Sequence, residues 1–233
     1  MIFDMFPHTN CSYDLDFYVN NFKIAKTTSS KYLGVIIDSC LSWKLHINNL
    51  CMQLRKYIGI FYKLSFKLPP ATLKLLYFAL IYPHILYAIE IYANTYLSYM
   101  HDLIILNNRL LRILQHKPRT THTIELYMAY KTLPIMKLFQ LQILLHAYKL
   151  LYLPDSLPII FQNTIVINTA LHSHNTRTKF DFHRTTFTSS VGSKISNGLC
   201  AKFWNQLPLE LKVFSSVHNF QRKMKLYLLS NEM

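Results

Sequence analysis

The hydrophobic positions near the start of the chain repeat every second residue. Between residues 17 and 37, apolar and β-branched side chains form two runs, separated by the polar stretch 26–31. Alternation with a period of two is typical of half-buried β-strands. We therefore predict two short strands, one at 17–24 and one at 32–37.

From residue 42 onward the apolar spacing changes to about 3.6 residues, the period of an amphipathic α-helix. Ser42 is the candidate N-cap of the first helix, and Pro69 and Pro70 end it because proline cannot continue a helix interior. Further helices are predicted at 71–81, which Pro83 kinks or ends, and at 85–92, 97–116, 124–131, 135–151, 194–206 and 217–229. The expected fold class is mainly α with a small N-terminal β-hairpin (α+β).

The net charge of the chain indicates a polyanionic partner, which the helical pattern alone does not. The net charge is +14, with 9 Lys and Arg against 6 Asp and Glu in residues 1–102, and 16 against 5 in residues 103–233. Such an excess favours nucleic acid, because cations that neutralise phosphates release condensed counterions. A membrane surface, or a basic surface with no particular partner, is the alternative.

Several other classes are not favoured by the sequence. The apolar stretch 75–89 is shorter than the roughly 20 residues of a membrane span and contains Pro83, so we predict a buried helix pair and no membrane partner. The N-terminus lacks the pattern of a signal peptide, and we expect a cytoplasmic or nuclear protein. The cysteines show no C-x-x-C pair, and they are expected to be buried thiols in a reducing compartment rather than zinc ligands. They are Cys11, Cys40, Cys51 and Cys200.

Residues 31–38, which read Lys-Tyr-Leu-Gly-Val-Ile-Ile-Asp, are followed by Leu41, Trp43, His46 and Ile47. This pattern resembles the segment just beyond the catalytic centre in reverse transcriptases of jockey-like and related non-LTR retrotransposons. Similar matches follow in the same order at 106–113, Leu133–Pro134 with Phe139, 175–177 and 202–208, with Phe220 and Lys223 beyond. Each motif alone is weak, and their joint order over nearly the whole chain makes the resemblance specific.

The resemblance implies an architecture and a parent activity. Residues 1–41 would be a residual palm edge with a hairpin called the primer grip, 42–152 a helical thumb with the helices after it, and 153–233 a basic C-terminal region ending in helices. The parent enzyme is an RNA-directed DNA polymerase. Its partners would be RNA and DNA in the form of a template–primer duplex or the element RNA, together with the missing catalytic portion of the same element.

Polymerisation by two metal ions requires clustered carboxylates. No two acidic residues are adjacent in this chain, and Asp14 and Asp16, its one close pair, have no third ligand nearby in the sequence. By the resemblance, the catalytic aspartates belong upstream of Met1. We therefore expect no catalytic residue, metal ligand or cofactor here and no enzymatic activity from this chain alone, with Mg²⁺ needed only by the intact parent enzyme.

The nucleic-acid-binding candidates come from four places in the sequence. The primer grip would position a primer end by backbone and aromatic contact, unless its side chains fill the core. The charges of the thumb helix and of a second basic stripe with Arg119 would contact phosphates, unless they are solvated faces. A C-terminal group interleaved with Phe180, Phe182 and Phe187 suits single-stranded RNA or a flexible arm, unless the phenylalanines are core. The candidates are Tyr32, Leu33, Gly34, Lys44, Arg55, Lys63, Arg109, Arg112, Lys117, Arg177, Lys179 and Arg184.

Two further expectations complete the prediction. Trp204 is expected to lie in the core and to anchor the last helices. The competing function is a helical protein-interaction module with no nucleic-acid role, which would dock a partner through exposed apolar surface.

Overall fold

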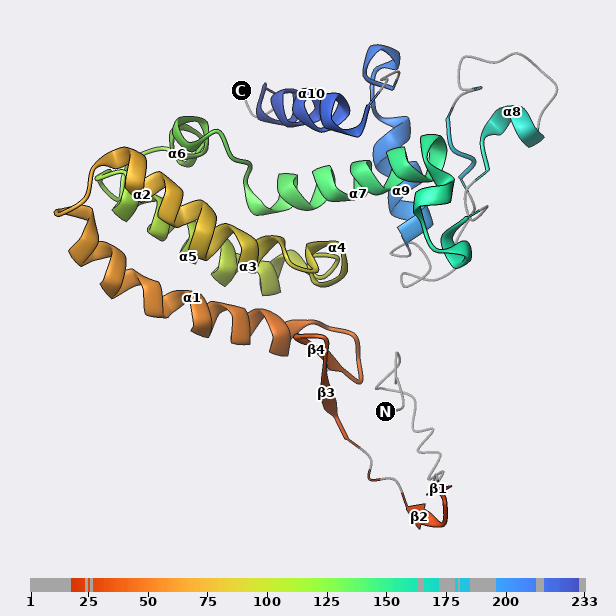
Figure 1. Cartoon of the computed structure of the whole chain (residues 1–233), viewed down its shortest axis with the longest axis horizontal. Helices are drawn as coiled ribbons and strands as arrows, with labels where there is room; N and C mark the ends of the chain where they lie inside the picture. Colours follow the sequence, from red (N-terminus) through yellow and green to blue (C-terminus); the bar gives the residue numbers. More distant parts are fainter. Residues whose placement is uncertain are drawn as a thin grey trace. The chain divides into compact units, whose positions relative to one another are not determined.

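The computed structural model describes residues 18–23, 25, 27–162, 166–171, 179, 181–184, 196–212 and 216–230. It is mainly helical, with two small antiparallel strand pairs near the N-terminus (Figure 1), which confirms the expected mixture of helix and strand. The chain divides into two compact units, the first ending at Thr121 and the second beginning at His122. This boundary falls inside the segment 42–152 of the sequence-based division.

The strands form two tight hairpins instead of two separate strands. β1 (Tyr18–Val19) pairs with β2 (Phe22–Lys23), and β3 (Ser29–Tyr32) pairs with β4 (Val35–Asp38). The predicted strand at 32–37 is therefore wrong, because it contains a turn. Leu33 has φ +45° and Gly34 has φ +83°, and two positive φ angles at the central positions are the signature of a type I′ hairpin turn.

The connection from this hairpin to the first helix depends on Asp38. Its carboxylate oxygens accept hydrogen bonds from the backbone N–H groups of Ser42 at 2.8 Å and Trp43 at 2.9 Å. The helix α1 (Lys44–Ser65) begins after Trp43, which has a left-handed backbone. Ser42 is thus not the N-cap, and the cap prediction is wrong. The Asp38 carboxylate, six residues before the helix, accepts the hydrogen bonds of the backbone N–H groups that lead into α1.

The remaining helices of the first unit follow the predicted order with two irregularities, a π-turn before Pro83 and a break at Tyr87–Ala88 that divides the predicted helix 85–92. They are α2 (Pro70–Leu76), the π-helix η1 (Tyr77–Ile81), α3 (Tyr82–Leu86), α4 (Ile89–Tyr92) and α5 (Leu97–Leu114). Pro83 neither ends nor breaks the helix, because the backbone passes into a π-turn in which Tyr82 N–H bonds the Tyr77 carbonyl. The wider turn absorbs the missing N–H of proline.

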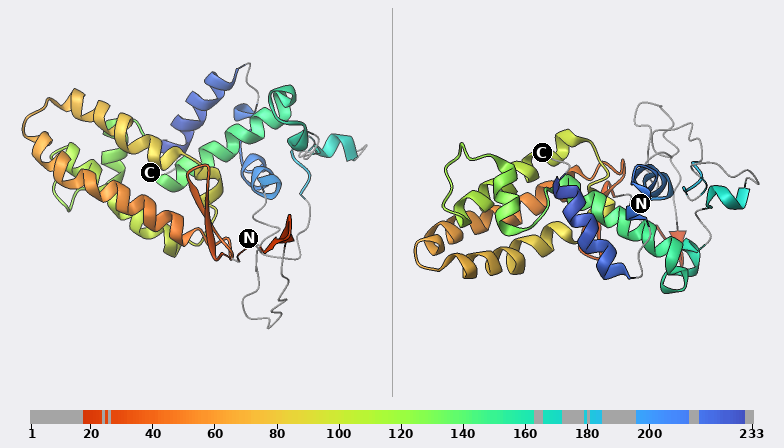
Figure 2. Two further views of the ribbon diagram at one scale, coloured as in Figure 1. Left: turned by 60° about the horizontal axis from the view of Figure 1, so that its bottom comes forward. Right: turned by 90° about the horizontal axis from the view of Figure 1, so that it is seen from above.

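The core of the first unit lies between α1, the α2–α3 helix and α5. Leu54 and Phe61 of α1 and Leu103 and Leu110 of α5 are fully buried. Figures 1 and 2 show α1 and α5 side by side. The hydroxyl of Tyr77 donates to Asn107 Oδ1 at 3.2 Å in the same core. None of the helices in the described ranges is long and apolar enough to cross a membrane.

The second unit is organised around α7 (Ile135–Tyr152), against which α9 (Ser196–Asn205) and α10 (Val217–Ser230) pack. The shorter helix α6 (Thr123–Tyr130) precedes α7. The other described elements of this unit are the helix α8 (Asn168–Leu171) and the 3₁₀ turns η2 (Pro154–Ser156), η3 (Ile159–Phe161) and η5 (Leu209–Leu211). Trp204 is fully buried, as predicted. Its ring lies 5.9 Å from that of Phe220, which stacks on Tyr148 at 4.6 Å between ring centroids.

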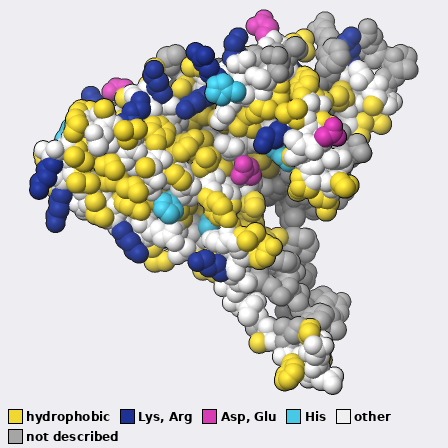
Figure 3. Space-filling view, viewed as in Figure 1, with side chains coloured by type: hydrophobic (Ala, Val, Ile, Leu, Met, Phe, Trp, Pro, Cys, Tyr) yellow, Lys and Arg dark blue, Asp and Glu magenta, His cyan; other side chains and the backbone are white. Residues whose placement is uncertain are grey.

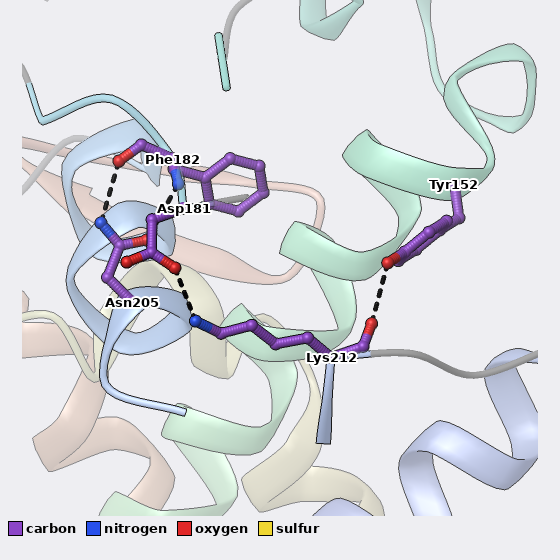
Figure 4. A network of polar contacts seen from close by, with 5 residues as sticks. All are labelled: Tyr152, Asp181, Phe182, Asn205 and Lys212. Carbon is purple, nitrogen blue, oxygen red and sulfur yellow. Dashed lines mark hydrogen bonds and ion pairs between the residues drawn. The ribbon is translucent and has the colours of Figure 1, made fainter. Parts of the chain in front are cut away.

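A polar network fixes the segment around Phe182 to the end of α9 (Figure 4). The Asn205 amide accepts a hydrogen bond from Phe182 N at 3.0 Å and donates one to Phe182 O at 2.9 Å. Next to it, Lys212 Nζ lies 2.7 Å from Asp181 Oδ1 in a buried ion pair. The Tyr152 hydroxyl donates to the Lys212 carbonyl at 2.8 Å. The Trp-Asn sequence at 204–205 thus has a structural explanation, since one residue fills the core and the next holds a neighbouring backbone.

Candidate nucleic-acid interface

A groove of about 970 Å³ lies between the C-terminal halves of α1 and α5 in the first unit. Residues from α1 form one wall, and residues from α5 and the loop that follows it form the other. Because both walls come from the ends of helices that run in the same direction, residues about 50 positions apart in the sequence face one another here. We call this site the α1–α5 groove.

The second wall of the α1–α5 groove is cationic. It carries Arg109, Arg112, Lys117 and Arg119, and no Asp or Glu is among the lining residues. Arg109, Lys117 and Arg119 are exposed. Over the helices of the first unit, the view in Figure 3 shows Lys and Arg side chains along the margin of a largely hydrophobic surface. Cations without carboxylate neighbours present their full charge to an approaching anion.

Arg112 differs from the other three cations because its side chain holds the loop after α5. It is half-buried, and its Nη2 donates to the Thr121 carbonyl at 3.1 Å. The Lys117 N–H in turn bonds the Arg112 carbonyl at 2.9 Å. Arg112 Nε is buried and has no hydrogen-bond partner within the described part of the chain. These contacts tie the loop after α5 back to the helix and so position Lys117 and Arg119 at the groove.

The first wall of the groove carries exposed aromatic rings. Tyr62 is 59% exposed and Phe66 is 70% exposed. Their ring centroids are 5.4 Å apart in an edge-to-face arrangement, and the Phe66 ring lies 5.8 Å from that of His116 on the opposite wall. Gly59 lies one turn before Tyr62, and a Cβ added there would meet nothing within 4 Å. The wall therefore combines a row of rings with an open position.

The structure brings together the predicted basic stripe at Arg109, Arg112 and Lys117, but it leaves the thumb-helix candidates outside the groove. Lys44, Arg55 and Lys63 are exposed on α1 and do not line it. The Lys44 ammonium lies 5.6 Å from the centroid of the Tyr99 ring, a cation–π contact. These three residues therefore form no common site with the stripe.

The hairpin candidates occupy a separate place in the first unit. Tyr32 and Leu33 are exposed at the tip between β3 and β4. The Tyr87 hydroxyl donates to the Leu33 carbonyl, and the Tyr87 ring lies beside Gly34. A second cavity of about 390 Å³ lies beneath the hairpin, lined in part by Gly34 and His46.

His46 holds the hairpin to α1. Its Nδ1 accepts a hydrogen bond from the Ile36 N–H at 3.3 Å, and its ring lies 5.1 Å from that of Tyr92. Burial lowers the pKa of this imidazole, because an apolar environment disfavours the charged form. The neutral ring, with Nδ1 as acceptor, is the form that fits this contact.

The C-terminal candidates are only partly described. Arg177, Phe180 and Phe187 lie outside the described residues. Lys179 is half-buried and Arg184 is exposed. Phe182 is fully buried with its ring 5.4 Å from that of Trp204, so its interpretation as a base-stacking residue is wrong. Its alternation with basic residues reflects a core position within a basic segment.

The sequence prediction missed Tyr62, Phe66, His116 and Gly59 as groove residues. Tyr62 and Phe66 are four residues apart and so share a face of α1, which was a usable signal. The pairing of that face with the end of α5 is a tertiary contact that no periodicity reveals.

The described residues include no group of three or more His, Cys, Asp or Glu side chains that could hold a metal ion. Cys51 and Cys200 are buried, as predicted, and burial raises the pKa of the Cys200 thiol to about 12. Cys40 is exposed, so the prediction of a buried thiol is wrong there. Comparisons with models of protein families, with curated proteins and with solved structures found no match.

Proposed function

We propose that this chain is the primer-grip, thumb and C-terminal part of a non-LTR retrotransposon RNA-directed DNA polymerase, without the catalytic aspartates. It binds RNA and DNA independently of sequence and is inactive as a polymerase alone. The ordered series of motifs along the sequence supports the origin. The observation that carries the binding is the α1–α5 groove, where four cationic side chains meet without a carboxylate.

The chemistry of the groove favours phosphate over base edges. Arg and Lys neutralise backbone phosphates and carry no sequence information when they do so. Arg109, Lys117 and Arg119 are exposed on one wall, where they can follow successive phosphates. Binding of this kind weakens steeply with salt, because each neutralised phosphate releases condensed counterions.

The test is the salt dependence of binding in a variant that carries Arg109→Ala, Lys117→Ala and Arg119→Ala. Arg112 is kept, because its bond to Thr121 holds the loop after α5. We expect the slope of log K against log salt concentration to flatten by about two to three units. Fluorescence anisotropy with labelled oligonucleotides of unrelated sequence measures both the slope and the lack of sequence preference.

A matched control removes three charges from the second unit with Lys149→Ala, Lys202→Ala and Arg222→Ala, all at exposed positions. It should leave the slope within one unit of the wild-type value. An equal loss in both variants would mean that net charge, and not the groove, determines binding. Primer extension by the wild-type chain with template and Mg²⁺ would contradict the proposal that the chain is inactive alone.

A helical protein-interaction module is the second candidate. It is favoured by large exposed apolar side chains on α1 and α5, among them Met52, Ile60 and Ile105. Exposed apolar surface of sufficient extent marks a partner site. Failure to bind any oligonucleotide at low salt would favour this candidate over the first.

A further inference from the structure

We propose that the α1–α5 groove takes an unpaired stretch of nucleotides, in which bases stack on Tyr62 and Phe66 while the phosphates follow Arg109, Lys117 and Arg119. This inference rests on the proposed nucleic-acid binding and names the class of ligand. The shared chemistry is that of an unpaired strand, and DNA and RNA are its two sources.

The exposed aromatic rings are the first reason. Phe66 is 70% exposed and Tyr62 is 59% exposed. In a duplex the base faces are already stacked on one another, so such rings could reach them only at a duplex end. With an unpaired strand, every base offers a face, and stacking on an aromatic side chain strengthens binding whatever the base.

The size of the groove is the second reason. Its volume of about 970 Å³ is near the upper end of the 300–1,000 Å³ typical of small-ligand sites. That space suits a few nucleotides. One turn of duplex, about 34–36 Å long, is too large to enter this volume.

The open position at Gly59 is the third reason. Glycine in a helix interior weakens the helix by roughly 0.5–1 kcal/mol relative to alanine, and here no neighbour requires its small size, since nothing lies within 4 Å of an added Cβ. The missing side chain leaves the wall open one turn before Tyr62. An inserted base could occupy this space.

The two walls thus provide the two contacts that single-strand binding requires. The aromatic rings lie on the wall formed by the end of α1, and the cationic side chains lie on the wall formed by α5 and the loop after it. His116 joins the two sets, because its ring lies 5.8 Å from that of Phe66 and it is next to Lys117 in sequence. Arg112 fixes the loop, so that the distance between rings and cations is set before a strand arrives.

The experiment uses the full chain with Phe66→Leu, which keeps an apolar side chain but removes the stacking face. Labelled single strands of about ten nucleotides, one of DNA and one of RNA, are compared with a blunt duplex that has the same number of phosphates. We expect Phe66→Leu to weaken single-strand binding about tenfold. Duplex affinity and the salt slope should not change, because no cation is removed.

A second variant, Gly59→Leu, fills the open position and should also weaken single-strand binding. The control is Tyr96→Leu, which removes an exposed ring of the same unit that does not line the groove. Circular dichroism confirms that each variant is folded. Loss on one single strand only would assign the site to DNA or to RNA and support the inference.

Two results would overturn the inference. If Phe66→Leu binds both single strands as the wild type does, the rings do not stack on bases. If it loses the same factor on the duplex as on the single strands, the site does not distinguish unpaired nucleotides. In either case the chain still binds nucleic acid. If the wild type binds none of the probes, the proposed function itself fails, and this inference fails with it.

Discussion

Replacing Asn205 by alanine tests whether the polar network of the second unit stabilises its fold. Asn205 makes two hydrogen bonds to the backbone of Phe182, at 3.0 Å and 2.9 Å. Alanine removes both and leaves the Phe182 N–H and carbonyl without these partners. A net contribution of roughly 0.5–1.5 kcal/mol for each bond gives an expected loss of about 2 kcal/mol in the free energy of unfolding.

The chain contains two tryptophans, and one lies in each unit. Trp204 is buried in the second unit, and Trp43 lies at the start of α1 in the first. Fluorescence of a Trp43→Phe background therefore reports urea unfolding around Trp204 alone. With an m-value of about 1–1.5 kcal/mol/M for a unit of this size, Asn205→Ala should lower the midpoint by about 1.3–2 M.

The neighbouring amide provides the control. Gln206 is exposed and directly follows Asn205, so Gln206→Ala should change the free energy of unfolding by less than about 0.5 kcal/mol. If Asn205→Ala unfolds at the same urea concentration as the wild type, the two bonds do not stabilise the unit. If Gln206→Ala loses as much as Asn205→Ala, a general sensitivity of the chain at the end of α9, and not the network, explains the effect.

Three further outcomes are expected in the first unit. Gly59→Ala should raise the free energy of unfolding by about 0.5–1 kcal/mol. Urea denaturation followed by Trp43 fluorescence in a Trp204→Phe background measures this change. A decrease would mean that another group occupies the open position in the folded chain. Asp38→Ala removes the acceptor of two N–H bonds and should lower the thermal midpoint in circular dichroism, equivalent to about 1–2 kcal/mol, whereas an unchanged midpoint would show that water replaces the carboxylate. Because burial lowers the pKa of His46, the unfolded chain binds more protons below pH 6.5 and stability should fall as the pH drops from 7.5 to 5; the part due to this residue should be missing in His46→Asn, and an equal pH slope in both proteins would contradict it.

The helical part of the fold could be predicted from the sequence because helices depend on short-range patterns. The predicted helices at 135–151 and 217–229 correspond to α7 (Ile135–Tyr152) and α10 (Val217–Ser230) with almost the same ends. In both, the apolar period is uninterrupted and the flanking residues favour a helix end.

The strands and caps were predicted less well because their determinants lie further apart or compete. The alternation at 32–37 continues through a turn, and only Gly34 indicates the reversal. Asp38 serves the start of α1 from six residues before Lys44, beyond the usual capping window. In each case one residue with a special backbone or a side-chain acceptor overrides the periodic pattern.

The cationic wall of the candidate site could be predicted from the sequence, and the aromatic wall could not. The cations of α5 share a helix, so that their proximity follows from spacing alone. Tyr62 and Phe66 face them only because α1 packs on α5 in one particular register. That register depends on which apolar faces meet, which a single sequence does not reveal. Phe182 was ambiguous for a different reason. A phenylalanine in the core and a phenylalanine that stacks on a base look the same in the sequence, and only its burial distinguishes the two.

The π-turn at Tyr77–Ile81 has a consequence for how this helix keeps one side against its neighbours. Leu73, Tyr77, Ile81 and Ile85 are spaced by four, and all are almost fully buried. In a regular α-helix of 3.6 residues per turn, a spacing of four drifts steadily around the axis. The turn with i→i+5 bonding advances less per residue and reverses that drift. One π-turn thus keeps a four-residue repeat on one side of the helix.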